Sequence, residues 1–261
     1  MCSLIIAYSL PFDKFLRLSV DYTMTHINEF TISELSFIAS AYSGYFKEPR
    51  IISKIESIVL ENAKSISLNQ CIELMQSFLL SDCGEDLWLM FDMIIGRNVR
   101  KVTDGQIVPI LETYSKSPFK REKLFSLFIH KIKSSSLSVS DNCKLVKIYS
   151  MVQFDQPQIF EFMQDRLFLK IGEMTDEDMV DAFIGFSNPI VKKQFKIVKI
   201  LEDYVMQNIE KVSLENAARM LLNYGNLRKG KKDAVLTCRE RVDSAVVETE
   251  VQKVPPQTVL E

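Results

Sequence analysis

The stretch TISELSFIASAYS (residues 31–43) decides the fold, because its three-part pattern returns along the chain. A hydroxyl residue stands at Thr31, a carboxylate three residues later at Glu34, and an aromatic residue eleven residues after the start at Tyr42. Six such starts follow one another at intervals of 35 to 38 residues: Thr31, Ser67, Thr103, Ser138, Thr175 and Ser213. The matching aromatic residues are Tyr42, Phe78, Tyr114, Tyr149, Phe186 and Tyr224, and the acids or amides are Glu34, Gln70, Gln106, Asp141, Asp178 and Asn216. A pattern that recurs six times at three positions is a repeat.

Each start is expected to begin a helix. A Ser or Thr side chain at the N-cap accepts a hydrogen bond from a free N–H of the first turn, and an acid or amide at the third helical position bonds back to the N-cap N–H. Apolar residues follow seven, eight and eleven residues after the start, as in Ile38, Ala39 and Tyr42, which is the spacing of one helix face. One repeat departs from the pattern. Pro109 lies six residues after Thr103, which predicts that this helix starts late or is bent.

A second amphipathic helix follows each first helix, as in IISKIESIVLENAKSI (51–66). The links between the two helices contain residues that end or begin helices: Pro49, Pro118, Pro157, Pro189 and Gly84. Helix pairs of this size bury their apolar stripes only by stacking on neighbouring pairs. The predicted fold is therefore all-α, an α-solenoid of about five to seven helix–turn–helix repeats.

The pattern predicts an array of repeats over residues 1–242. Whole repeats are expected at 31–66, 67–102, 103–137, 138–174 and 175–212, with partial repeats at 1–30 and 213–242. The stretch LIIAYS (4–9) matches the end of a first helix, so the chain is expected to open partway through a repeat. Residues 243–261 have no helical period and are acidic, which predicts a flexible tail.

Composition limits the function. Hydrophobic residues make up 47% of the 261 residues, enough for a buried core, and a formal net charge of −2 gives no global attraction to nucleic acid or anionic lipid. The five cysteines are scattered singly and only two histidines exist, so the sequence predicts buried free thiols and no metal site. No apolar run approaches the roughly 20 residues that span a bilayer, and no targeting segment is visible, so we expect no membrane insertion.

The sequence contains no pattern of catalytic residues. Neither His26 nor His130 stands in an interpretable arrangement with a nucleophile and a carboxylate, and no glycine-rich phosphate-binding loop is present. The acids of TDEDMVD (175–181) lie at a helix start, where they favour the helix dipole, so we interpret them as capping residues. Trp88 is expected in the core. The prediction is a protein that is not an enzyme, with no cofactor and no small-molecule substrate.

Nucleic-acid binding is the alternative that the sequence leaves open. Repeat proteins that read single bases place polar residues at fixed positions of the first helix, but the residues six after each start are mixed in character: Phe37, Glu73, Pro109, Lys144, Asp181 and Arg219. Phosphate binding needs only local positive charge. The candidate residues for RNA or partner binding lie in and around NLRKGKKDAVLTCRER (226–241) and in the second helix of the fifth repeat: Arg219, Arg228, Lys229, Lys231, Lys232, Arg239, Arg241, Lys192, Lys196 and Lys199. A solvated lysine face is the other interpretation.

The repeat resembles a known family. Its Ser/Thr start, the acid or amide three residues on, and the ending A-Y/F-S resemble the heptatricopeptide repeat of FASTK- and RAP-domain-type organellar proteins, best in TISELSFIASAYSGYFKEPRIISKIESIV (31–59). Pentatricopeptide and octotricopeptide repeats are similar in length. The resemblance covers residues 3–225, and we find no C-terminal RAP-like module. It implies a mitochondrial or plastid location and work in RNA metabolism or the organellar ribosome.

These observations together lead to one expected function and two alternatives. We expect a non-catalytic scaffold subunit of a mitochondrial ribonucleoprotein assembly such as the mitochondrial ribosome, which binds proteins of the complex and RNA through phosphate contacts. The first alternative is a freestanding RNA-binding factor for organellar transcript processing or stability. The second is an accessory subunit of a respiratory complex.

Overall fold

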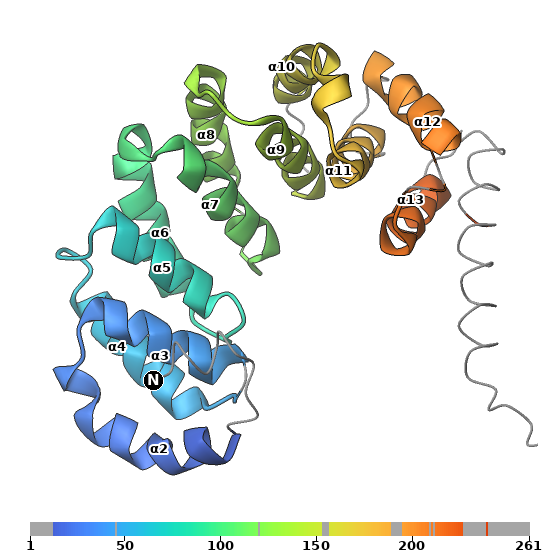
Figure 1. The fold of residues 1–261 in the computed structure, drawn as a ribbon. Helices are drawn as coiled ribbons and strands as arrows, with labels where there is room; N and C mark the ends of the chain where they lie inside the picture. Colours follow the sequence, from blue (N-terminus) through green and yellow to red (C-terminus); the bar gives the residue numbers. More distant parts are fainter. Residues whose placement is uncertain are drawn as a thin grey trace, which may run out of the picture. The chain divides into compact units, whose positions relative to one another are not determined.

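The structure is all-α, as the sequence predicts. The computed structural model describes residues 13–226, apart from 45, 120, 153–156, 189–194, 209 and 211, together with residue 239. This part of the chain contains twelve α-helices and no strand (Figure 1).

The helices alternate between the first and second helices of the predicted repeats. The first helices are α3 (Ile32–Gly44), α5 (Leu68–Phe78), α7 (Asp104–Lys116), α9 (Val139–Met151), α11 (Asp176–Ser187) and α13 (Leu214–Asn226). The second helices are α2 (Asp13–His26), α4 (Pro49–Glu61), α6 (Glu85–Asn98), α8 (Glu122–Ser134), α10 (Pro157–Phe168) and α12 (Lys196–Asn208). Short 3-10 helices precede three of the first helices: η1 (Ile27–Glu29), η2 (Val99–Lys101) and η3 (Ile171–Glu173).

Each of the six first helices begins one residue after a predicted hydroxyl start, which confirms these helix boundaries. The predicted caps are also present. Ser67 N–H donates to Gln70 Oε1 at 3.0 Å, while the N–H of Gln70 donates to Ser67 Oγ at 3.4 Å. In α9 the N–H of Asp141 donates to Ser138 Oγ at 3.0 Å. The local sequence therefore decides where these helices start, because it satisfies their free N–H groups.

Of the two outcomes predicted from Pro109, the late start is wrong, and the bend stays a prediction. Helix α7 begins at Asp104, directly after Thr103, whose N–H donates to Gln106 Oε1 at 3.0 Å. Pro109 lies inside the helix and supplies no N–H to the helical ladder. Its carbonyl accepts a hydrogen bond from Thr113 Oγ1 at 2.8 Å. The cap at the helix start is kept although one interior hydrogen bond is lost.

The cap of α11 gives a first testable prediction. Thr175 N–H donates to Asp178 Oδ2 at 3.0 Å, and the N–H of Asp178 donates to Thr175 Oγ1 at 3.2 Å. Replacing Thr175 with alanine removes one acceptor, so we expect the free energy of unfolding to fall by about 1 kcal/mol. Urea unfolding followed by circular dichroism measures the change. Thr175→Ser keeps the hydroxyl and serves as the control, and equal losses in the two variants would contradict the capping role.

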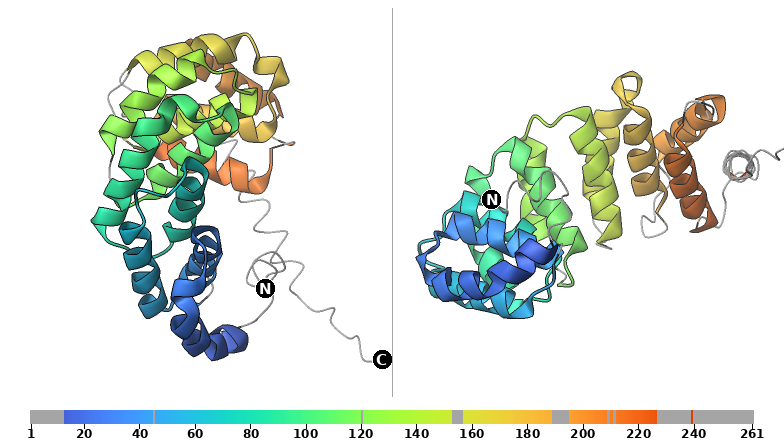
Figure 2. Two further views of the ribbon diagram at one scale, coloured as in Figure 1. Left: turned by 90° about the vertical axis from the view of Figure 1, so that its left-hand side faces the viewer. Right: turned by 60° about the horizontal axis from the view of Figure 1, so that its bottom comes forward.

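The chain divides into two compact units, residues 1–135 and 136–261. The first contains α2 to α8 and the second α9 to α13, so the boundary falls beside the predicted start at Ser138. Within each unit consecutive helices form hairpins, which Figure 2 shows from two further sides. First helices also pack on first helices, α3 on α5 in one unit and α9 and α13 on α11 in the other. A continuous solenoid along the whole chain stays a prediction.

Five of the six repeated aromatic residues lie in the core, as expected, and the side chain of Tyr224 lies outside the described part of the structure. The side chains of Tyr42, Phe78, Tyr114, Tyr149 and Phe186 are buried, at 0 to 2% exposure. Trp88 is also in the core, with its ring 5.5 Å from that of Tyr114 in an edge-on arrangement. The periodic apolar positions of the sequence therefore correctly predict the buried face of the first helices.

Small residues set the spacing where first helices touch. Ser43 Oγ donates to the carbonyl of Ser77 at 2.9 Å, which joins α3 to α5. At the contact of α9 with α11, a Cβ built on Gly185 would lie 2.7 Å from the carbonyl carbon of Val146 and 2.8 Å from the N of Lys147. A side chain at position 185 therefore cannot fit beside the backbone of α9 without moving that helix.

The second helices are joined by a contact that the sequence did not predict. The eighth residue of α4, Glu56, accepts a hydrogen bond at 2.9 Å from the N–H of Gly84, the N-cap of α6. The eighth residue of α6, Asp92, lies 2.7 Å from Nε of Arg121, the N-cap of α8. The eighth residue of α10 is Gln164, which accepts a hydrogen bond from the first N–H of α12 at 2.9 Å. Glu56 and Gln164 therefore cap the following second helix, whereas Asp92 pairs with the side chain of its N-cap residue.

The described cysteines are buried free thiols, as the sequence predicts. Burial raises the pKa of Cys71 to about 12 and also raises the pKa values of Cys83 and Cys143. Because the thiolate is the nucleophile, we expect iodoacetamide at about pH 8 to leave all three unmodified in the native protein. Urea should expose them, and peptide mass spectrometry measures both states. Rapid labelling of Cys71 without denaturant would contradict the prediction. Cys2 and Cys238 lie outside the described residues.

Candidate binding surface

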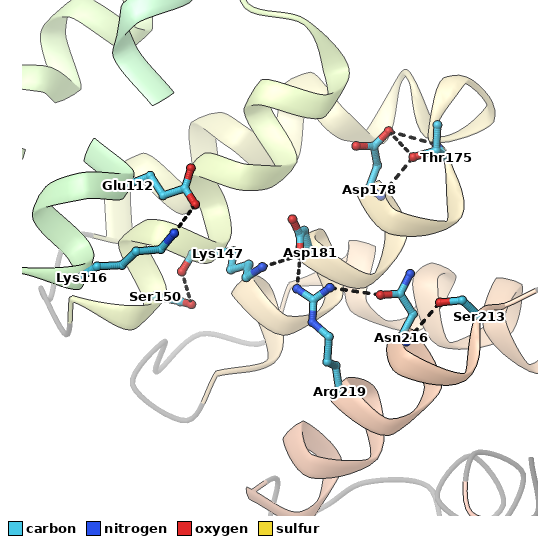
Figure 3. A network of polar contacts seen from close by, with 10 residues as sticks. All are labelled: Glu112, Lys116, Lys147, Ser150, Thr175, Asp178, Asp181, Ser213, Asn216 and Arg219. Carbon is cyan, nitrogen blue, oxygen red and sulfur yellow. Dashed lines mark hydrogen bonds and ion pairs between the residues drawn. The ribbon is translucent and has the colours of Figure 1, made fainter. Parts of the chain in front are cut away.

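Three first helices of the second compact unit meet at a polar cluster. Lys147 from α9 and Arg219 from α13 both approach Asp181 of α11, and Figure 3 shows the two cations on either side of the carboxylate. Lys147 Nζ and one terminal nitrogen of Arg219 each lie 2.8 Å from Asp181 Oδ1. The other terminal nitrogen of Arg219 donates to Asn216 Oδ1 at 3.0 Å. We call Lys147, Asp181 and Arg219 the ionic cluster.

The ionic cluster is buried at its centre and open at its sides. Asp181 is 3% exposed, whereas the side chains of Lys147 and Arg219 are 27% and 26% exposed. Two cations share one carboxylate, so the cluster carries a surplus positive charge that lies close to solvent. The buried carboxylate stabilises the cations in place, and the exposed parts of the cations can contact an anionic partner.

Part of the interpretation of the acids at 175–181 is wrong. Asp178 does cap α11, as its hydrogen bonds with Thr175 show. Asp181 is not a capping residue, because it lies further along the helix and pairs with Lys147 and Arg219. The sequence identified Arg219 as a candidate but missed Lys147. The only signal was its position, nine residues after Ser138, on the helix face that meets the next repeat.

The predicted binding residues have different places in the structure. Arg219 belongs to the ionic cluster, and its guanidinium is held by Asp181 and Asn216. Lys196 and Lys199 are exposed on α12, three residues apart on one face. Arg239 is exposed. The remaining candidates lie outside the described residues: Arg228, Lys229, Lys231, Lys232, Arg241 and Lys192.

The described residues offer little that is typical of a catalytic centre. They contain no group of three or more His, Cys, Asp or Glu that could hold a metal ion. A groove of about 630 Å³ in the first compact unit has a mainly apolar lining with hydroxyl and acidic groups, and its lining contains no His or Cys. His130 is exposed on α8.

None of the described helices combines the length and the apolar character that crossing a bilayer requires.

The groove is lined by residues of α3 and α4 and of the helix links next to them. Tyr42 and Ile52 contribute apolar surface, and Glu48 is engaged by Arg50, whose Nε lies 2.8 Å from Glu48 Oε1. This hydrogen bond lowers the pKa of Glu48 below its usual range. Glu56, which also lines the groove, accepts the N–H of Gly84. Glu48 is thus paired with Arg50, and Glu56 with the N-cap of α6.

Comparisons with known proteins give no match, either to a family profile or to a curated protein sequence.

Proposed function

We propose that this protein is a non-catalytic helical-repeat scaffold, which binds proteins of a larger ribonucleoprotein assembly and contacts RNA through phosphate groups. One observation supports the proposal most strongly: capped first helices recur at the six hydroxyl starts, and the aromatic residues of the first five are buried in the described core. Stacked helix pairs expose long surfaces, and proteins built in this way generally work by binding. The resemblance to heptatricopeptide repeats is the reason why we propose a mitochondrial location and an assembly such as the mitochondrial ribosome.

A tagged full chain expressed in its own cells tests the proposal. We expect the protein to fractionate with mitochondria and to sediment with a large complex, and mass spectrometry of the purified complex should identify ribosomal or RNA-processing proteins. Ribonuclease treatment should shift the sedimentation. A protein that sediments alone and retains one defined RNA would support the freestanding RNA-binding factor instead. Respiratory subunits in the complex would support the accessory-subunit alternative.

The phosphate contacts give a second test, on the purified chain. We expect weak RNA binding, and we expect Lys196→Ala/Lys199→Ala to weaken it further, because two phosphate contacts are lost. For single-stranded RNA, each phosphate contact adds about 0.7 to the steepness with which log affinity falls as log salt concentration rises. The slope of log affinity against log salt concentration should therefore fall by about 1.4. Fluorescence anisotropy with a labelled RNA measures it.

The matched control for this test is Lys54→Ala/Lys64→Ala, since both lysines are exposed in the first compact unit and neither is a predicted binding residue. We expect this variant to keep the salt slope of the wild-type protein. Equal slopes for both double variants and the wild-type protein would show that Lys196 and Lys199 belong to a solvated face.

A further inference from the structure

Two neighbouring second helices expose large apolar side chains on one face. Leu89 and Met93 of α6 are 45% and 53% exposed, and Leu127 of α8 is 46% exposed. Leu89, Met93 and Gly96 follow one another along a single face of α6. A Cβ built on Gly96 would lie 3.9 Å from Leu127 Cδ1, so the exposed side chain of α8 lies beside the same face. We call Leu89, Met93 and Leu127 the apolar ridge.

Two of the other second helices, α4 and α10, lack an apolar ridge, whereas α12 carries Ile200 and Tyr204, both half-buried, at the corresponding positions. The fifth and ninth residues of the helix, which are Leu89 and Met93 in α6, are Ser53 and Ser57 in α4. In α10 they are Glu161 and Asp165. All four of these residues are exposed, as Leu89 and Met93 are. Helices α4 and α10 stack with polar side chains at these positions, so stacking does not require apolar ones there. Exposed apolar side chains that stacking does not require are typical of an interaction site.

The two ends of the apolar ridge differ in charge. Three exposed cations, Arg97, Arg100 and Lys101, stand at its end near the C-terminus of α6, where α8 packs on η2. None of the three makes an ion pair within the described part of the chain. At the opposite end, in the first turns of α6 and α8, the exposed acids Asp86 and Glu122 stand beside an exposed cation, Lys123, which lies four residues before Leu127 on the same face of α8.

We propose that the apolar ridge and its flanking cations form the docking surface for an amphipathic helix of a partner protein, with acidic residues that face Arg97, Arg100 and Lys101. Such a helix places its apolar stripe on Leu89, Met93 and Leu127. Its carboxylates neutralise cations that have no ion pair in the described chain. This inference names a surface and a partner for the proposed scaffold and rests on that function.

Two other classes of partner fit the surface less well. Nucleic acid binds through phosphates, which gain nothing from three exposed apolar side chains. An anionic membrane attracts basic surfaces, but the mixed charges of Asp86, Glu122 and Lys123 at the other end of the ridge give no net attraction to it. A helix can match apolar, basic and acidic positions in one direction along its length, which a uniform anionic surface cannot do.

A displayed library of helical peptides tests the proposal with the full chain. Its members keep leucine along one face and carry random glutamate, lysine or serine elsewhere. We expect the selected peptides to be enriched in glutamate at one end. A labelled selected peptide should bind roughly tenfold more weakly to Leu89→Ser/Met93→Ser, which reproduces the serines of α4, and also to Arg97→Glu/Arg100→Glu. Lysine in place of the peptide's glutamates should restore binding to the charge-reversed variant.

The controls separate a local effect from a loss of fold. All substituted residues are exposed, so circular dichroism should be unchanged, and Glu161→Ser/Asp165→Ser on α10 should bind the peptide like the wild-type protein. Three results would overturn the proposal: a selected pool without acidic bias, equal binding to Leu89→Ser/Met93→Ser, or ridge-dependent binding of RNA or phosphatidylserine vesicles in place of the peptide. If the peptide test fails while the tagged protein still sediments with a large complex, the scaffold function stands and uses another surface.

Discussion

Replacing Gly185 with alanine is expected to lower the free energy of unfolding by about 3 kcal/mol, the upper end of the cost of overpacking. The added methyl group would meet the carbonyl carbon of Val146 and the N of Lys147 at 2.7 and 2.8 Å, and it would also clash with Val146 Cγ1. A side-chain atom can rotate away, but backbone atoms move only if α9 moves. Urea unfolding followed by circular dichroism measures the loss.

Two further variants test the reason for this loss. Gly105→Ala adds the same methyl group to α7, where nothing lies within 4 Å of it. Because alanine has a better helix propensity than glycine, this variant should raise the free energy of unfolding by about 0.5–1 kcal/mol. Gly185→Ala combined with Val146→Ala should remain unstable, because the backbone contacts persist. A stable Gly185→Ala protein would show that α9 and α11 do not approach as closely as described.

Replacing Asp181 with asparagine should lower the free energy of unfolding by about 2–3 kcal/mol. The amide keeps the shape of the carboxylate but leaves Lys147 and Arg219 without their shared anion, and Asp181 itself is 3% exposed. The loss should be smaller than for a fully buried pair, because the cations can turn toward water.

A charge-matched control is available in the same helix. Glu177 is exposed in the first turn of α11, and Glu177→Gln removes the same charge with an expected change within about 0.5 kcal/mol. A double-mutant cycle adds a second readout. Asp181→Asn should lower the free energy of unfolding much less in a protein that already carries Lys147→Met and Arg219→Met. Equal effects of Asp181→Asn and Glu177→Gln would exclude a structural role for the ionic cluster.

The sequence predicted helix starts and buried faces with accuracy because both depend on nearby residues. A cap joins residues three apart, as in Ser67 and Gln70, and the buried aromatic lies three turns further along the same helix, as in Phe78. The wrong prediction of a late start of α7 has a local cause as well. The cap at Thr103 begins the helix, and the missing N–H of one proline does not delay that start.

The candidate sites were predicted less well because they depend on contacts between repeats. Arg219 was identified from its charge alone, whereas its partner Asp181 was interpreted as a cap and Lys147 was not considered. Most of the basic residues near the C-terminal end of the repeat array lie outside the described residues, so their part in binding stays a prediction. The apolar ridge was also missed, because Leu89 and Met93 belong to the almost continuous apolar run LWLMFDMI (87–94), in which composition alone does not separate the buried face from the exposed one.

The sequence by itself determined the all-α class, the six helix starts, the caps and the buried aromatic residues, since hydrogen bonds and periodicity within one helix decide them. Only the tertiary structure decided that Gly185 meets the backbone of α9, that Asp181 pairs with two cations, and that Glu56 caps the next second helix. These contacts join residues about one repeat apart. They depend on the relative shift and rotation of neighbouring helices. The lengths of the links and the packing of the side chains set this shift and rotation, and the sequence pattern within one helix does not.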